Sequence, residues 1–89
     1  MPRMASRARG IKKSLRSPAH LAFCALMVRA RETAKLTQQD LAKRLKKHQS
    51  FVAKYEGGER RIDVVEFLAI TRAIGADPVG ILKALRKRA

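Results

Sequence analysis

The sequence predicts an all-α domain of five short helices, preceded by a basic arm without regular structure. Three observations favour this fold class. The chain has 89 residues, enough for one small core. Apolar residues recur at helical spacing, and no segment sustains the alternation of a strand. Residues that typically begin and end helices separate the apolar segments, so each segment predicts one helix.

The predicted arm comprises residues 1–17. It carries six basic side chains and no acidic one, and it shows no apolar periodicity. Such a segment buries too little apolar surface to fold alone. We therefore expect residues 1–17 to be flexible and residues 18–89 to form the folded domain.

The first helix is expected to begin at Pro18, with Ser17 as its N-cap, and to end near residues 33–35. Its predicted apolar stripe comprises Phe23, Met27, Ala30 and Ala34. His20 is expected at the solvent edge. Cys24 has no second cysteine in the chain to pair with, and its apolar neighbours predict a small buried residue.

The second and third helices are short and lie close together in the sequence. The second, about residues 38–45, follows Thr37, and Asp40 stands where a capping box usually has Glu or Gln. The third covers about residues 49–56, and the glycine pair at 57–58 ends it because one glycine can adopt the left-handed conformation.

The last two helices are also delimited by capping residues. Asp63 precedes the fourth helix, about residues 64–74, and Gly75 ends it. The residues noted along this helix are Val64 or Val65, Leu68, Ala69 and Arg72. Asp77 and Pro78 begin the fifth helix, whose expected apolar side comprises Ile81, Leu82 and Leu85.

The composition favours a polyanionic partner over catalysis. The chain has 21 Lys and Arg against 7 Asp and Glu, so its net charge is +14, which attracts nucleic acid. No apolar run is long enough to span a membrane. The histidines stand far apart without a neighbouring ligand set, and no nucleophile–base cluster or glycine-rich phosphate loop is present. We therefore expect no metal, no cofactor and no enzymatic activity.

The third helix has the pattern of a helix that enters a DNA groove. Val52 and Tyr55 can dock it on the core, while its outer positions carry Gln49, Ser50, Ala53 and Lys54. The major groove admits one helix, and a glutamine amide can pair with adenine through two hydrogen bonds. Phosphate-binding cations are available on both flanks: Lys43, Lys46, Lys47, Arg60 and Arg61.

The motifs "LTQQDLAKRL", "QSFVAKYEGGERR" and "VVEFLAITRAIGADP" resemble the helix-turn-helix domain of phage repressors and Cro proteins, the lambda-repressor-like family to which XRE-like regulators belong. The resemblance covers about residues 20–85. It implies a five-helix lambda-repressor-like DNA-binding domain, with the helix-turn-helix at about residues 38–56.

The resemblance also implies roles for single residues. Gln38 matches a glutamine that braces a phosphate and the recognition helix, and Gln49 matches the first base-reading glutamine. Arg31 and Glu56 match a partly buried salt bridge. The expected DNA-binding residues are Gln38, Lys43, Lys47, His48, Gln49, Ser50, Ala53, Lys54, Arg60 and Arg61.

This sequence departs from the family pattern at three positions. Lys35 and Lys46 stand where the family usually has glycine, and a left-handed lysine costs about 1 kcal/mol. His48 stands where serine or threonine often caps the recognition helix, which predicts a weaker cap.

The leading hypothesis is a cytoplasmic, nucleoid-associated regulator of bacterial or phage origin that binds specific double-stranded DNA. We expect a repressor that acts as a homodimer on a palindrome, with a dimer contact through Val79, Ile81 and Leu85. Two alternatives are an antitoxin that binds a toxin partner, and a protein that compacts nucleic acid without sequence preference.

Overall fold

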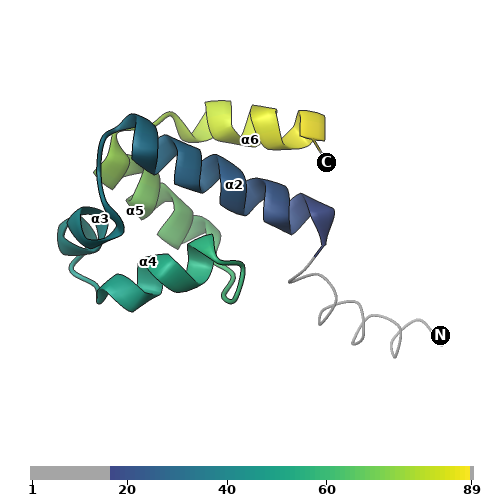
Figure 1. The fold of residues 1–89 in the computed structure, drawn as a ribbon. Coiled ribbons are helices and arrows are strands. Elements are labelled where there is room, and N and C mark those ends of the chain that lie inside the picture. Colours follow the sequence, from purple (N-terminus) through teal and green to yellow (C-terminus); the bar gives the residue numbers. More distant parts are fainter. Residues whose placement is uncertain (1–16, 89) are drawn as a thin grey trace.

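The computed structural model describes residues 17–88, which form five α-helices and no strand (Figure 1). The helices are α2 (Pro18–Thr33), α3 (Gln38–Leu45), α4 (Gln49–Glu56), α5 (Val64–Ile74) and α6 (Pro78–Arg88). These bounds confirm the predicted all-α fold. The predicted arm, apart from Ser17, lies outside the described residues. Between residues 17 and 88, no helix combines the length and the apolar character of a membrane-spanning segment.

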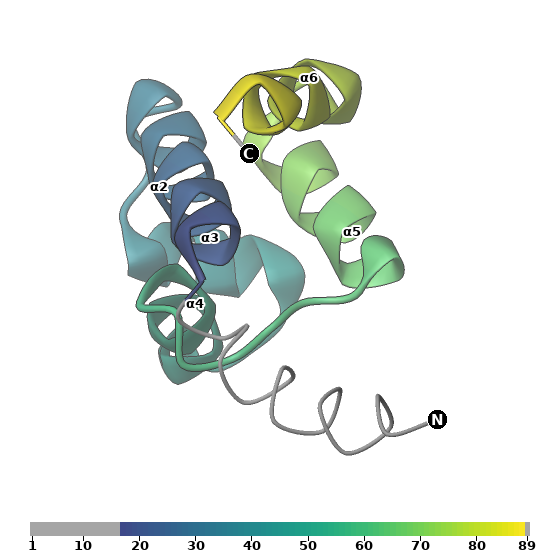
Figure 2. The ribbon, with the colours of Figure 1, turned by 90° about the vertical axis from the view of Figure 1, so that its right-hand side faces the viewer.

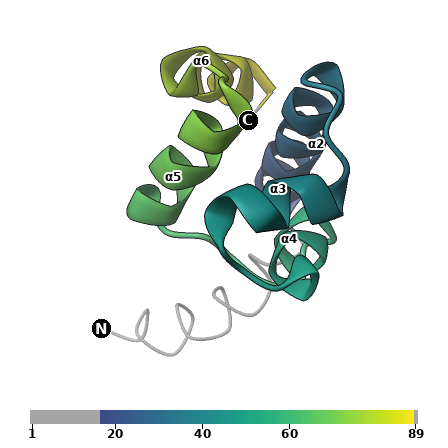
Figure 3. The ribbon, with the colours of Figure 1, turned by 90° about the vertical axis from the view of Figure 1, so that its left-hand side faces the viewer.

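The arrangement of the helices leaves α4 open on one side. α2 and α6 run side by side, and α3 packs against α4 (Figure 1). α4 and α6 lie on opposite sides of the molecule, with α2 and α5 between them (Figures 2 and 3). One face of α4 therefore reaches the core while its other face points away from the bundle.

Hydrogen-bonded caps explain why the helices begin where the sequence predicts. Ser17 caps α2 as expected. Thr37 Oγ1 accepts from the Asp40 N–H at 3.0 Å, and Asp40 Oδ2 accepts from the Thr37 N–H at 2.9 Å. This confirms the predicted capping box. A second box, not predicted, joins Asp63 and Glu66 at the start of α5. Local side-chain chemistry therefore fixes both starts.

The core confirms the predicted docking face of α4 but corrects the stripe of α2. Val52 and Tyr55 are buried beside Met27. His20, which was expected at the solvent edge, is buried instead, and burial followed by the nearby positive charge of Arg61 lowers the pKa of its imidazole. The expected stripe residue Ala34 is exposed because α2 ends one residue earlier.

The residues noted along α5 from the sequence are not the ones that pack into the core. The structure buries Phe67, Ile70, Thr71 and Ile74, while Val64, Val65, Leu68, Ala69 and Arg72 are exposed. α5 is apolar over most of its circumference, so periodicity alone does not decide which side packs against the other helices. On α6, Ile81 and Leu85 are half-buried as expected, but Leu82 is exposed.

Two lysines adopt the left-handed conformation that the sequence comparison with the family suggested. Lys35 has φ 61° and Lys46 has φ 57°. Lys46 ends α3, and its N–H donates to the Lys43 carbonyl at 3.1 Å. The turn into α4 is therefore built with the backbone geometry that glycine favours, although it carries a lysine.

We expect Lys46→Gly to stabilise the domain by about 1 kcal/mol, which is a rise of about 4–8 °C in melting temperature. The control is Lys47→Gly, which removes the same charge at a residue without a positive φ. It should lower the melting temperature, because glycine gives the unfolded chain more conformational freedom. Thermal denaturation followed by circular dichroism measures both. Equal changes for the two variants would show that relief of charge, rather than of backbone strain, dominates.

Candidate nucleic-acid interface

The outer face of α4 presents the residues that were predicted to contact DNA. Gln49 and Lys54 are exposed and lie about 140° apart around the helix axis. The arc between them holds Ser50 and Ala53, which are half-buried. Because Val52 and Tyr55 hold the opposite side in the core, the whole arc can approach a groove without unfolding the helix.

The cap of α4 is made by an imidazole. His48 Nδ1 accepts from the Ser50 N–H at 3.1 Å and lies 2.9 Å from Ser50 Oγ. The ring thus replaces the hydroxyl that usually occupies this position. It also places His48 and Ser50, both predicted DNA-binding residues, against each other at the start of the helix.

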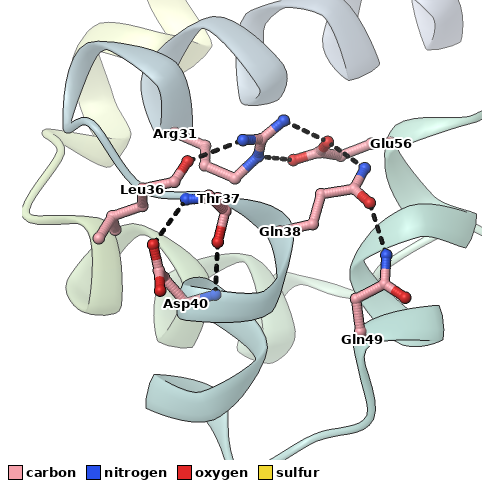
Figure 4. A network of polar contacts seen from close by, with 7 residues as sticks. All are labelled: Arg31, Leu36, Thr37, Gln38, Asp40, Gln49 and Glu56. Atoms are coloured by element: carbon pink, nitrogen blue, oxygen red, sulfur yellow. Dashed lines mark hydrogen bonds and ion pairs between the residues drawn. The ribbon is translucent and has the colours of Figure 1, made fainter.

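A chain of hydrogen bonds runs from α2 to the first residue of α4 (Figure 4). Arg31 donates from Nε to Glu56 Oε2 at 2.8 Å and from Nη2 to Oε1 at 3.0 Å. Gln38 Nε2 donates to the same Oε1 at 2.9 Å. Gln49 Nε2 donates to Gln38 Oε1 at 2.7 Å. The expected Arg31–Glu56 salt bridge is therefore present, and it continues into the predicted base-reading side chain.

The carboxylate of Glu56 sets the direction of this chain. An ionised carboxylate only accepts hydrogen bonds, so Gln38 must turn its amide nitrogen toward Glu56 and its oxygen toward Gln49. Gln49 must then turn its own nitrogen toward Gln38. That bond takes one of the two N–H donors of Gln49 and leaves the other donor and the carbonyl oxygen. One donor and one acceptor side by side match the N7 and N6 groups of adenine.

The salt bridge is shielded from water. The side chains of Arg31 and Glu56 are only 11% and 4% exposed. Arg31 Nη1 also donates to the Leu36 carbonyl at 2.8 Å, so its guanidinium is held from both sides. The hydrogen bonds to Glu56 raise the pKa of Arg31. Arg31 therefore stays charged, and the pair holds the end of α4 against α2.

The predicted phosphate-binding cations fall into different groups. Lys43 is exposed on α3. Lys47 Nζ and Arg60 Cζ lie 5.3 Å and 4.8 Å from the centroid of the Phe51 ring, so these two cations share one aromatic side chain. Arg61 lines a separate hollow of about 230 Å³ with Ser17, His20 and Leu85. The structure thus brings Lys47 and Arg60 together and directs Arg61 elsewhere.

Comparison with known proteins identifies the family of this fold. A family described as a helix-turn-helix domain matches residues 22–82. The chain belongs to the helix-turn-helix family. The solved structure of an XRE-family like protein from Pseudomonas syringae pv. tomato str. DC3000 is 42% identical, with a TM-score of 0.76, over 86% of this chain and 94% of that chain. No curated protein matches the chain.

At the family level, the chain is an XRE-like, DNA-binding transcription regulator. α3 and α4 together cover residues 38–56, the range that the family resemblance assigns to the helix-turn-helix.

The helix-turn-helix unit also exposes one polar residue that sequence reasoning missed. A hollow of about 470 Å³ lies between the starts of α3 and α4, and its lining includes Gln38, Gln39 and Gln49. Gln39 is exposed there. The paired glutamines of the "TQQD" motif were the available signal, because the first two helical residues of α3 both lie at the end nearest Gln49.

Proposed function

We propose that this helix-turn-helix protein represses transcription by binding a specific double-stranded DNA site, with α4 in the major groove. Gln49 would read an adenine, and Lys54 a guanine or a nearby phosphate. The observation that supports this most strongly is the Gln49–Gln38 hydrogen bond, because it orients an exposed amide before any DNA is bound. An amide that is already oriented loses less side-chain freedom on binding.

The charge around α4 supports the same function. Three exposed cations lie near the helix: Lys43 on α3, and Lys47 and Arg60, which both lie over the Phe51 ring. Phosphate contacts position a protein on the duplex, and base contacts give specificity. The proposed interface has candidates for both kinds of contact.

Selection of bound sites from random duplex DNA tests the proposed function. We expect an enriched motif, bound about 10³-fold or more tightly than a scrambled duplex at the same salt concentration. If every duplex binds equally, the alternative of sequence-independent compaction gains support. Salt dependence alone does not separate the two hypotheses, since both predict it.

We further infer that two copies bind one palindromic site. α4 has eight residues, and a helix of this length reads only a few base pairs, so two copies would discriminate better than one. The contact would use exposed apolar residues on α5 and α6, namely Val64, Val65, Leu68, Val79 and Leu82. An apolar groove of about 280 Å³ lies among them.

This dimer surface revises the one expected from sequence. Val79 is exposed as expected, but Ile81 and Leu85 are half-buried within the domain itself. The net charge of +14 on each copy opposes association in solution. DNA neutralises part of this charge, so we expect the dimer to form on the operator. If the protein were instead an antitoxin, we would expect its toxin partner to bind to the same apolar surface.

Leu82→Glu is expected to abolish the 2:1 complex on a palindromic duplex and to leave 1:1 binding, because it places a charge in the apolar surface. The control is Leu21→Glu, the same change at an exposed leucine of α2 that does not line the groove. Analytical ultracentrifugation with excess protein measures the stoichiometry. A wild-type complex that never exceeds 1:1 on the selected palindrome would rule out the dimer.

A further inference from the structure

Four side chains form a cluster where the loop after α4 returns to α5: Lys47, Phe51, Arg60 and Glu66, here called the Phe51 cluster. Arg60 Nη1 and Nη2 donate to Glu66 Oε1 and Oε2 at 3.2 Å and 2.9 Å. The guanidinium also lies over the Phe51 ring, 4.8 Å from its centroid. A loop arginine is therefore held by side chains from two helices.

The partners of Arg60 leave a defined edge of its guanidinium open. A guanidinium has five N–H donors. Nη1 uses both of its donors, on Glu66 Oε1 and on the Arg61 carbonyl at 2.9 Å, and Nη2 uses one on Glu66 Oε2. These bonds leave the Nε–H and the second Nη2–H, which lie on the same edge. That edge is a fork that fits two oxygens of one phosphate.

The side chains that hold Arg60 are themselves fixed. Phe51 packs edge-on against the buried Tyr55, with ring centroids 5.5 Å apart. Glu66 Oε1 accepts from the Asp63 N–H at 2.9 Å, within the capping box of α5. The hydrogen bond from Arg60, followed by that from Asp63, lowers the pKa of Glu66, so this carboxylate stays charged. The two side chains that hold Arg60, Phe51 and Glu66, are here called the brace. The brace is therefore anchored in α4 and α5.

Lys47 extends the cluster toward the turn before α4. Its Nζ lies 5.3 Å from the centroid of the same Phe51 ring. Both cations were predicted to bind phosphate. The ring brings together a point charge and a planar fork, which suits a diester phosphate next to the groove.

We propose that Glu66 and Phe51 are positioning residues that hold Arg60 and Lys47 as a two-cation site for one DNA phosphate beside α4. This inference rests on the proposed function and deepens it. Glu66 is negative and would by itself repel DNA. It strengthens binding because it fixes the orientation of Arg60, whose long side chain would otherwise lose its freedom on binding.

Glu66→Gln tests this proposal. If the brace matters, DNA affinity should fall, whereas the gain in positive charge by itself predicts that DNA affinity should rise. Glutamine can still complete the capping box, but it cannot neutralise Arg60. The brace predicts binding about threefold to tenfold weaker to both the selected and the scrambled duplex, although the protein gains net positive charge. The control is Glu59→Gln, the same charge change at an exposed residue, which should bind equally or more tightly. If Glu66→Gln binds as tightly as Glu59→Gln or more tightly, the brace is wrong.

The dependence of DNA affinity on salt concentration gives a second measurement. Its slope reports the number of phosphate contacts, which a structural role of Arg60 alone would not change. Arg60→Ala should reduce the magnitude of the salt slope by about 0.9, because one phosphate contact is lost. Arg60→Lys keeps the charge but loses the fork, so it should weaken binding and keep the slope. If Glu66→Gln does not fold, Arg60→Lys still tests the proposal. An Arg60→Lys protein that binds DNA as tightly as the wild type would overturn it.

The outcomes also separate this site from the proposed function. If Gln49→Ala relaxes sequence preference while Arg60→Ala and Glu66→Gln change neither affinity nor slope, the phosphate site is wrong and sequence-specific binding stands. If the wild type prefers no duplex over another, the proposed function itself fails. Arg60→Ala would then still report whether the site binds phosphate.

Discussion

Replacing Glu56 with alanine is expected to lower the free energy of unfolding by about 3 kcal/mol, because it leaves the charge of Arg31 shielded and uncompensated. The side chain of Arg31 is only 11% exposed and gives two hydrogen bonds to Glu56. Gln38 loses a partner as well. For a domain of this size, the loss corresponds to a melting temperature lower by about 12–24 °C.

Thermal denaturation of Glu56→Ala and Glu59→Ala in parallel provides the comparison. Glu59 is an exposed glutamate three residues further along the chain, and its replacement should change the melting temperature by only a few degrees. A Glu56→Ala protein that melts within about a degree or two of the wild type would show that the salt bridge contributes nothing to stability.

Gln49→Ala is expected to cost about 1–3 kcal/mol on the preferred site, roughly a fivefold to 150-fold loss of affinity, and little on random DNA. The reason is that Gln49 presents an oriented donor and acceptor, which only a matching base can satisfy. Specificity should relax at one base position in each half-site.

Lys47→Ala is the matched comparison for Gln49→Ala, since a phosphate contact carries no base information. It should weaken the selected and the scrambled duplex by the same factor. Titration of each variant against both duplexes at one salt concentration measures the two effects. If Gln49→Ala also weakens both duplexes equally, α4 does not read bases through Gln49.

The helix boundaries could be predicted because local side chains determine them. The Thr37 and Asp40 side chains bond to each other's backbone N–H groups, and Asp63 caps α5 in the same way. These contacts span three residues, so the sequence displays them directly. The family resemblance added the role expected of Gln38, which no local pattern implies, whereas the base contact expected of Gln49 also followed from its outer position on the third helix.

The packing of α5 and the hydrogen-bond network could not be derived from local sequence. α5 offers apolar residues on most sides, and only contact with the other helices selects Phe67 and Ile70 for the core. Arg31 and Glu56 are 25 residues apart, so the resemblance alone brought them together. His20 was misplaced because a lone polar residue gives no sign that the tertiary fold covers it.

The most direct measurement is a crystal structure of the protein bound to its selected duplex. We predict α4 in the major groove, with the Gln49 oxygen and nitrogen each about 3 Å from N6 and N7 of one adenine. The Gln49–Gln38 and Gln38–Glu56 hydrogen bonds should persist in the complex. A complex in which α4 lies outside the groove, or in which Gln49 faces no base, would contradict the central claim that this hydrogen-bonded amide reads the DNA sequence.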